Sequence, residues 1–293
     1  MTIRHLRIFV KVCECKSITN AAKKLYMTQP AVSLAIRELE ESYGIRLFDR
    51  LSRRIQITDN GKRMLEYVIH IVDLFDDMER AIKNPDAVGE LRIGSSLTIG
   101  SYLLPRYVER LTSLFPGIKP RVFVNNSDSI FKSVKEGRLD IGLVEGAVSD
   151  DTLIISSFMD DRLIAVCGQR HPFAQRESIS LDEFLSQPLL LRERGSGTRE
   201  LFQSAVTLLG KHIDPAWESV STTALIRAAE AGNGVAVLPE KLVEEYLAVG
   251  RLVRVPLQNL QLSRSFFLIY HKNKYLSTSI RSLIGIVMGN KDD

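Results

Sequence analysis

The chain carries few side chains of the kinds that usually perform metal or redox chemistry. Its five histidines are scattered, and neither H-E-x-x-H nor the Cys-His spacing of a zinc site occurs, so we expect no metal site. Cys13, Cys15 and Cys167 are too few and too odd in number for a disulfide framework. We expect structural roles for all three, with Cys13 and Cys15 left open as candidates for redox sensing.

Two serine-rich turns are the next candidates for chemistry, and a hydrolase is the class that they first suggest. The nucleophile elbow G-x-S-x-G is absent, however, because Leu97-Thr98 follows Ser95-Ser96. A dinucleotide fingerprint is absent as well, because Gly195-Ser196-Gly197 continues as Thr198-Arg199-Glu200. We therefore predict no catalytic residue, no cofactor, and a protein that is not an enzyme.

The same two turns suit the binding of an anion. Each lies where an apolar strand gives way to a helix, so backbone N–H groups and hydroxyls are available there. The predicted effector contacts are Ser96, Thr98, Ser196 and Thr198, with Ser127, Glu145 and Thr222 as second choices. The alternative is that each Ser or Thr only caps a helix. Arg192, Arg194 and Arg199 are expected at the surface or in ion pairs.

Positive charge is concentrated at the start of the chain. The formal net charge is +4, but residues 1–62 alone carry 12 Lys and Arg against 6 Asp and Glu. The remainder is slightly acidic, which suggests that only this basic head meets a polyanion.

Helical spacing organises the head. The apolar pattern predicts an amphipathic helix over 3–13, and a short second helix with Thr19 as its N-cap. A third helix begins with Thr28 as its cap and Pro30 in its first turn. Its predicted buried stripe is Val32, Ala35, Ile36 and Leu39. Two short helices around a tight turn form a helix-turn-helix, whose second helix enters the major groove.

Residues 45–61 predict a wing. Arg50, Arg53 and Arg54 lie among apolar residues, and an alternating IQIT segment follows before the turn residues 59–61. A hairpin that carries arginines suits phosphates or a narrow minor groove.

Residues 21–61 closely resemble the DNA-binding domain of the LysR-type transcriptional regulators. The matching positions are Ala21-Ala22, Leu25, Gln29-Pro30-Ala31-Val32-Ser33, Ile36, Leu39-Glu40, Gly44, Leu47-Phe48, Arg50, Thr58 and Gly61. Thr28 stands where serine is usual, and it keeps the capping hydroxyl.

The resemblance implies a set of DNA contacts. Base-edge contacts are implied for Gln29 with its neighbours Thr28, Pro30 and Ala31, and a glutamine amide can pair with an adenine edge. Ser33 is implied to reach a phosphate. Minor-groove or backbone contacts are implied for Arg53 and Arg54. Arg50 suits DNA contact and an internal ion pair equally well.

A long helix is predicted from about residue 60 to residue 83. Its apolar positions are Leu65, Val68, Val72, Phe75 and Ile82, with Met64, Ile71 and Met78 seven apart. The resemblance implies that this helix packs against the same helix of a second subunit, giving a homodimer that assembles into a homotetramer. The alternative is packing on the chain's own effector domain.

Beyond Gly89, strands and helices alternate. This pattern predicts two similar α/β lobes joined by crossing strands, with a ligand cleft at the strand carboxyl ends. The segments starting at Gly94, Gly137 and Gly232 resemble the family's co-inducer domain, which is built like a periplasmic binding protein. LTIGSYLLP and RERGSGTRE are similar to the branch of carbon-fixation and sulfur-assimilation regulators.

The predicted fold class is α/β, comprising an N-terminal all-α winged helix-turn-helix, a long linker helix and a two-lobed α/β effector domain. The expected bounds are 1–60, 61–88 and 89–293, with lobe I at about 89–162 and 268–293 and lobe II at about 163–267. No run of about 18 apolar residues and no secretory signal occurs, so we expect no membrane partner and a cytoplasmic protein.

The resemblance implies a transcription regulator on double-stranded operator DNA, modulated by a small anionic co-inducer and acting on RNA polymerase. An architectural DNA binder without a ligand is the rival interpretation. It would not need about 200 residues shaped as a hinged pair of lobes.

Overall fold

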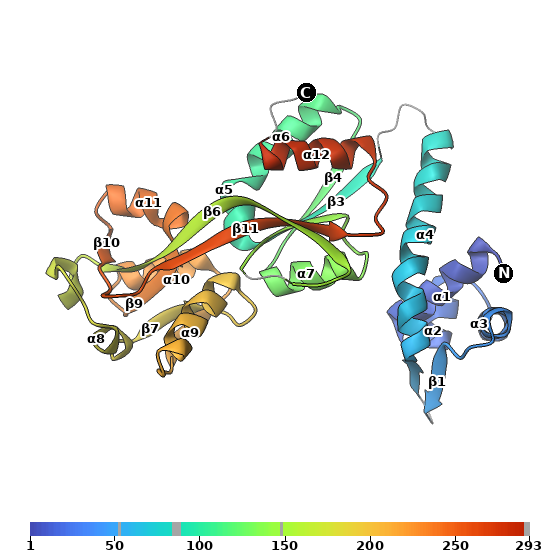
Figure 1. The fold of residues 1–293 in the computed structure, drawn as a ribbon, viewed down its shortest axis with the longest axis horizontal. Helices are drawn as coiled ribbons and strands as arrows, with labels where there is room; N and C mark the ends of the chain where they lie inside the picture. Colours follow the sequence, from blue (N-terminus) through green and yellow to red (C-terminus); the bar gives the residue numbers. More distant parts are fainter. Residues whose placement is uncertain (52–53, 84–88, 147–148, 290–293) are drawn as a thin grey trace. The chain divides into compact units, whose positions relative to one another are not determined.

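The computed structural model describes residues 1–51, 54–83, 89–146 and 149–289. The chain divides into two compact units (Figure 1). The first, here called the head unit, comprises Met1–Gly89 and Asn273–Tyr275. The second, the effector unit, comprises Glu90–Lys272 and Leu276–Asp293. The predicted fold class is confirmed, because helices and a hairpin build the head unit and a mixed α/β arrangement builds the effector unit.

Three helices form the head: α1 (Ile3–Cys15), α2 (Ile18–Lys24) and α3 (Gln29–Tyr43). The cap of α3 is confirmed, since Thr28 Oγ1 accepts a hydrogen bond from Ala31 N at 3.4 Å. The predicted stripe of α3 is buried at all four positions. Thr19 was the wrong N-cap for α2, because the helix begins earlier and the Ser17 hydroxyl accepts from Asn20 N at 3.3 Å.

The wing is an antiparallel hairpin of β1 (Phe48–Leu51) and β2 (Arg54–Ile57). Residues 59–61 do not form the expected turn, because helix α4 (Asp59–Lys83) begins there. Thr58 Oγ1 fixes the start of this helix, since it accepts from Gly61 N at 3.0 Å and donates to Arg46 O at 2.7 Å. A side chain at Gly61 would collide with the Leu47 carbonyl oxygen. Thr58 and Gly61 therefore join the start of α4 to the wing.

Glu40 ties the third helix to the same wing. Its Oε1 accepts from Leu47 N at 2.7 Å and from Phe48 N at 3.2 Å. The ring of Phe48 packs 5.6 Å from that of Phe9 in the head core. The Phe48–Phe9 contact and the Glu40 side chain of α3 together orient the wing.

Helix α4 packs one side against the head. Val68 is buried in the head core, and Met64, Leu65 and Val72 pack against that core. Arg7 of α1 lies over the Phe75 ring, 5.4 Å from its centroid, and pairs with Asp76 and Glu79. Helix α4 therefore contacts the rest of the head from Met64 to Glu79.

In the effector unit, the described strands form one nine-stranded sheet. In lobe I, β3 (Glu90–Ser95) pairs in parallel with β4 (Lys119–Val124) and β5 (Ile141–Glu145). In lobe II, β7 (Leu189–Arg192) pairs in parallel with β8 (Pro215–Ser219) and β9 (Val235–Pro239).

Two long antiparallel strands, β6 (Leu153–Gly168) and β11 (Leu262–His271), run between the lobes. Strand β10 (Leu252–Val255) pairs with β6 in lobe II. The parallel lobes joined by crossing strands are the arrangement that the sequence predicts, and β6 and β11 belong to both.

Lobe I carries α5 (Leu97–Tyr102), α6 (Leu104–Leu114), α7 (Ser127–Lys135) and α12 (Thr278–Met288). Helices α6 and α12 cover one face of its strands and α7 covers the other (Figure 1). Helices α5 and α6 are separate, with Leu103 between them. Pro105 lies in the first turn of α6, where its missing N–H costs nothing.

Lobe II carries the 3₁₀ turn η1 (Pro172–Gln175), α8 (Leu181–Leu185), α9 (Gly197–Leu208), α10 (Thr222–Glu230) and α11 (Glu240–Ala248). Alternate strand residues enter different cores. Leu189 and Leu191 pack in the cluster that includes Phe184 and Phe202, whereas Leu190 packs with Leu225. Burial on both faces explains why these strands are continuously apolar.

Candidate DNA-reading face and effector site

The first turn of α3 presents the residues predicted to read DNA. Thr28, Gln29 and Pro30 are exposed, and Ala31 and Ser33 are partly exposed. Gln29 Nε2 donates to Ser33 Oγ at 3.1 Å. A second Nε2 hydrogen and the amide oxygen remain available, which is the donor and acceptor pair that an adenine edge requires.

Tyr26 lies in the turn between α2 and α3, and the sequence did not single it out. Its side chain is 98% exposed, and its backbone has a φ of 54°. An isolated tyrosine before the TQPAVS motif offers no signal from spacing, since only the tertiary turn shows that it is fully exposed next to α3.

The wing arginines are described only in part. Arg50 lies in β1 opposite Ile55, and Arg54 lies at the start of β2. Their side chains and the whole of Arg53 lie outside the described residues. The DNA contacts assigned to these three residues remain predictions.

The predicted effector residues are all buried in the effector unit, but they do not form one group. Ser96 and Thr98 begin α5, Ser196 and Thr198 begin α9, and Glu145 ends β5. Ser127 begins α7 and accepts a hydrogen bond from Glu145 N at 3.3 Å. Thr222 lies apart from them in lobe II, where it accepts from Arg192 Nη1 at 3.4 Å.

Lobe I and lobe II are in contact where β5 ends and α9 begins. A side chain at Gly197 would collide with the Glu145 carbonyl oxygen and would lie 2.9 Å from Glu145 Cγ. Asp128 N of lobe I donates to Gly195 O of lobe II at 3.3 Å. The strand end in one lobe and the helix start in the other are therefore in direct contact.

Arg264 occupies the centre of this contact. Its Nε lies 2.8 Å from Asp161 Oδ2, and its Nη2 lies 2.7 Å from the same oxygen and 2.9 Å from Glu145 Oε2. Its Nη1 donates to Thr198 Oγ1 at 3.0 Å, and its Nη2 reaches Thr98 Oγ1 at 3.5 Å. One guanidinium on a crossing strand thus contacts both lobes.

Sequence reasoning missed Arg264 and its partner Asp161, although a signal was present. The two are cross-strand partners on β11 and β6. Arg264 lies on the same buried face of β11 as Leu262 and Phe266, and Asp161 lies on the same buried face of β6 as Leu163. A charged residue at an inward position of an alternating strand needs a buried partner, so alternation could have identified the pair.

Ser96 and Ser196 differ from other serines that precede helices in the described chain. The hydroxyls of Ser180, Ser221 and Ser277 each accept a hydrogen bond from the backbone of their helix. Ser96 and Ser196 make no such cap, and their hydroxyls are buried without a hydrogen-bond partner among the described residues. Simple capping therefore does not account for them.

The three arginines near the second serine turn have different environments. Arg192 is 1% exposed and forms an ion pair with Glu193, whereas Arg194 is exposed. Arg199 is buried rather than at the surface, and its Nε donates to Gln203 Oε1 at 3.1 Å. Burial holds the pKa of Arg199 below its usual value.

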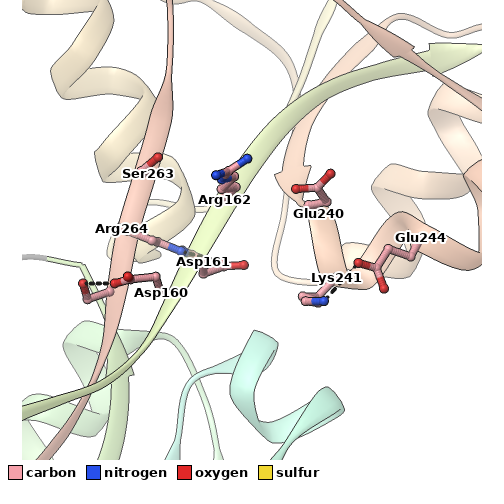
Figure 2. A pocket seen from close by; sticks show the side chains of 9 residues that line it. Asp160, Asp161, Arg162, Glu240, Lys241, Glu244, Ser263 and Arg264 are labelled. Atoms are coloured by element: carbon pink, nitrogen blue, oxygen red, sulfur yellow. Dashed lines mark hydrogen bonds and ion pairs between the residues drawn. The ribbon is translucent and has the colours of Figure 1, made fainter.

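A groove of about 570 Å³ lies beside the crossing strands (Figure 2). Asp160, Asp161, Arg162, Ser263, Arg264 and Ser265 line it on the strand side, and Glu240, Lys241 and Glu244 line it from α11. Figure 2 shows Arg264 and Asp161 next to each other between the two strands, opposite the α11 side chains. The buried ion pair is therefore also part of a groove wall.

The described residues contain no group of three or more His, Cys, Asp or Glu that could hold a metal ion. In the same part of the chain, no helix is long and apolar enough to cross a membrane.

Comparison with protein families gives two matches. Residues 3–62 match the model of the bacterial regulatory helix-turn-helix protein, lysR family, and residues 85–290 match the LysR substrate binding domain. The chain is 30% identical to the uncharacterized HTH-type transcriptional regulator YeiE of Escherichia coli K12, over 97% of this chain and 96% of YeiE. It is 29% identical to the RuBisCO operon transcriptional regulator of Allochromatium vinosum, over 94% and 92%.

Solved structures share the fold. A full-length OxyR variant of Pseudomonas aeruginosa matches with a TM-score of 0.71 and 20% identity, over 99% of this chain and 94% of that one. The CcmR regulatory domain of Synechocystis, in complex with 2-PG, matches with a TM-score of 0.63 and 22% identity, over 70% and 98%. With both family models covering nearly all of the sequence, the chain belongs to the LysR family of transcriptional regulators.

Proposed function

We propose that this DNA-binding transcriptional regulator changes its hold on an operator when a small anionic metabolite binds between the two lobes of its effector-binding domain. The observation that carries the proposal is the pair of buried serine hydroxyls, Ser96 and Ser196, that have no hydrogen-bond partner among the described residues. Such groups in a native protein call for an explanation, and a bound ligand supplies one.

The chemistry around these hydroxyls supports an anion. Arg264 provides a buried guanidinium, and α9 extends for 12 residues from the second serine turn. The N-terminus of a helix of this length favours negative charge. We assign Ser96, Thr98, Ser196 and Thr198 as contacts, with Ser127 and Glu145 beside them. Thr222 is a weaker candidate because it lies with Arg192.

At the DNA, the exposed first turn of α3 supports base contacts from Gln29 and its neighbours. Ser33 and the wing residues Arg50, Arg53 and Arg54 are assigned to the backbone or the minor groove.

An exposed apolar stripe on α4 supports dimerisation. Tyr67, Ile71, Leu74, Met78 and Ile82 are 60%, 48%, 44%, 45% and 71% exposed, at the spacing of helix-to-helix packing. The stripe lies apart from the residues that pack on the head, so we propose that it contacts α4 of a second subunit. Two such dimers would form a tetramer that acts on RNA polymerase in the cytoplasm.

The proposed mechanism couples the lobes to the heads. Effector binding changes the angle between the lobes and the contacts between subunits, which moves the heads along the DNA and changes its bend. The effector shifts this equilibrium only through its different affinities for the two arrangements. The CcmR regulatory domain, which takes 2-PG, supports a ligand-binding role for the shared fold.

The test begins with a thermal-shift screen of the full-length protein against small anionic metabolites, because a ligand of the native state raises apparent stability. Footprinting and DNA-bending assays with the best compound follow, and we expect a shortened or shifted footprint. Ser196→Ala should lose the response and keep operator binding. An unchanged footprint at saturating ligand would favour the purely architectural role.

The role of the DNA-reading face is tested by Gln29→Ala. We expect weaker binding to the operator and a smaller change on random DNA, because a base contact carries sequence preference and a phosphate contact does not. Equal losses on both DNAs would contradict the assignment of Gln29.

A further inference from the structure

A cation occupies the place where the sequence led us to expect an anion. Arg264 Nη1 lies 3.0 Å from Thr198 Oγ1 in the first turn of α9. Positive charge at a helix N-terminus is unfavourable by itself. Two carboxylates, Glu145 and Asp161, offset it, and both are buried, with 3% and 4% exposure. Arg264 therefore depends on these two acids to remain in the site.

The two acids hold Arg264 with unequal geometry. Asp161 Oδ2 accepts from Nε at 2.8 Å and lies 2.7 Å from Nη2, and the two residues face each other across β6 and β11. Glu145 makes one ion-pair contact at 2.9 Å, and its Oε2 has no hydrogen bond to any described residue. Glu145 is thus the partner that can be exchanged, while Asp161 stays with Arg264 on the crossing strands.

The site contains both hydrogen-bond donors and acceptors whose bonding capacity is not filled. Among the described residues, the Ser96 and Ser196 hydroxyls lack hydrogen bonds on the donor side. On the acceptor side, Asp161 Oδ1 lacks one, and Glu145 Oε2 has only its ion-pair contact with Arg264. A ligand with only acceptor atoms would satisfy the serines and leave the carboxylate oxygens unpaired. A ligand with acceptors and a donor would satisfy both sets.

We propose that Arg264 is the counter-ion of the effector, and that the effector is a small bifunctional acid with one anionic group beside a hydroxyl or ammonium donor. This inference rests on the proposed function and specifies its ligand. The anionic group replaces Glu145 on Arg264 and accepts from Ser96 and Ser196. The donor binds the displaced carboxylate of Glu145.

The donor is required because Glu145 cannot leave the site. Its backbone is held at the end of β5 against Gly197 and Ser127. Once displaced from Arg264, its carboxylate would be a buried charge without a partner, which is strongly disfavoured. A plain anion would add a second negative charge beside it. The groove beside the crossing strands reaches Arg264 and Asp161 of this ion-pair cluster.

The experiment measures binding of matched acids to the full-length protein by calorimetry and thermal shift, at constant ionic strength. Propionate is compared with L-lactate and L-alanine, and succinate with L-malate and L-aspartate. In each set, the acids with a donor should bind at least about fivefold tighter, the low end of what an unpaired buried polar group costs.

Glu145→Gln is the decisive variant, because it removes the charge that makes the donor necessary. In this variant propionate and succinate should bind, and the preference for lactate and malate should disappear. Asp128→Asn is the matched control. Its carboxylate also lies near the contact between lobes but is 48% exposed and paired with Lys132, so selectivity should be unchanged.

Equal binding of plain and donor-bearing acids to the unsubstituted protein would overturn the proposed ligand class. So would a Glu145→Gln protein that binds neither succinate nor propionate. Ser196→Ala separates this inference from the proposed function. If plain and donor-bearing acids bind equally and Ser196→Ala abolishes binding, the proposed effector cleft is supported and only the proposed ligand class is wrong. If donor-bearing acids are preferred and Ser196→Ala has no effect, the ligand binds at another site.

Discussion

Serine precedes several helices of the effector unit, and its role differs from one helix to another. The Ser221 hydroxyl accepts from Ala224 N at 3.2 Å and so caps α10. Ser196 precedes α9 in an equivalent position but makes no cap, and its hydroxyl is buried without a partner in the described structure. The same residue type therefore stabilises the fold at one site and is available to a ligand at the other.

This difference predicts opposite effects of two matched substitutions. Ser221→Ala should lower the free energy of unfolding by about 1 kcal/mol through loss of the cap. Ser196→Ala should leave it unchanged or raise it slightly, because an unpaired buried hydroxyl is removed. Urea denaturation measures both. A loss at Ser196 as large as that at Ser221 would show that Ser196 is structural.

The thiol of Cys13 bears on the open question of redox sensing. Burial, with a smaller contribution from Glu14, raises the pKa of Cys13 to about 12. Burial likewise raises the pKa of Cys167 to about 11. Because the thiolate is the reactive form, both residues are poor candidates for oxidation at neutral pH.

We therefore expect slow alkylation of Cys13 in the folded protein. Relative to a free cysteine of pKa about 8.5, its thiolate fraction at neutral pH should be lower by roughly a thousandfold. Iodoacetamide labelling followed by peptide mass spectrometry measures the rate, and the urea-unfolded chain is the control. If Cys13 is labelled in the native protein as fast as in the unfolded chain, it becomes a candidate for redox sensing again.

At the scale of elements, α4 has two apolar sides in different environments. One side, which includes Val68, completes the core of the head. The other carries Ile71, Leu74 and Met78, which remain exposed. The sequence pattern showed a wide stripe and could not divide it, because the division depends on where α1 packs.

The exposed side predicts the effect of a charge placed in its middle. Ile71→Asp should convert the proposed dimer to monomers, since burying an unpaired carboxylate at the proposed interface costs about 2 kcal/mol or more. Analytical ultracentrifugation measures the change. Lys62→Asp places the same side chain on α4 outside the stripe and should remain dimeric. A dimer that persists in Ile71→Asp would place the subunit interface elsewhere.

The elements of the head were the most predictable part of the molecule. Thr28, Pro30 and the apolar stripe of α3 each act within a few residues, so spacing alone identifies them. The start of α4 was predicted to within one residue, but the contacts that fix it were not: the bond from Thr58 to Arg46 O and the close approach of Gly61 to Leu47. Both are contacts between segments that are separate in the sequence.

At the scale of the effector unit as a whole, Arg264 links residues 166 positions apart in the chain, as its contact with Thr98 shows. It is the group through which β5, β6, α5 and α9 meet. The stability of this unit therefore depends on the pairing of this one side chain.

Arg264→Met should lower the free energy of unfolding of the effector unit by about 3–5 kcal/mol, because Glu145 and Asp161 would be buried without a counter-ion. Adding Glu145→Gln and Asp161→Asn should recover most of that loss. Urea unfolding of the three proteins decides the matter. A cost below about 1 kcal/mol for Arg264→Met would mean that the carboxylates find other partners or become hydrated.

The sequence by itself determined the family, the order of the elements and the two serine turns, since these follow from motifs and from periodicity along neighbouring residues. Only the tertiary structure decided which polar groups share a site. Ser96 and Ser196 were recognisable from the turns that contain them. Alternation along β6 and β11 marks Arg264 and Asp161 as inward-facing but does not say which groups they pair with, and Thr222 proved to belong to another contact. The physical reason is that pairing of buried charges depends on distance in space, and it is set when β6 and β11 cross between the lobes.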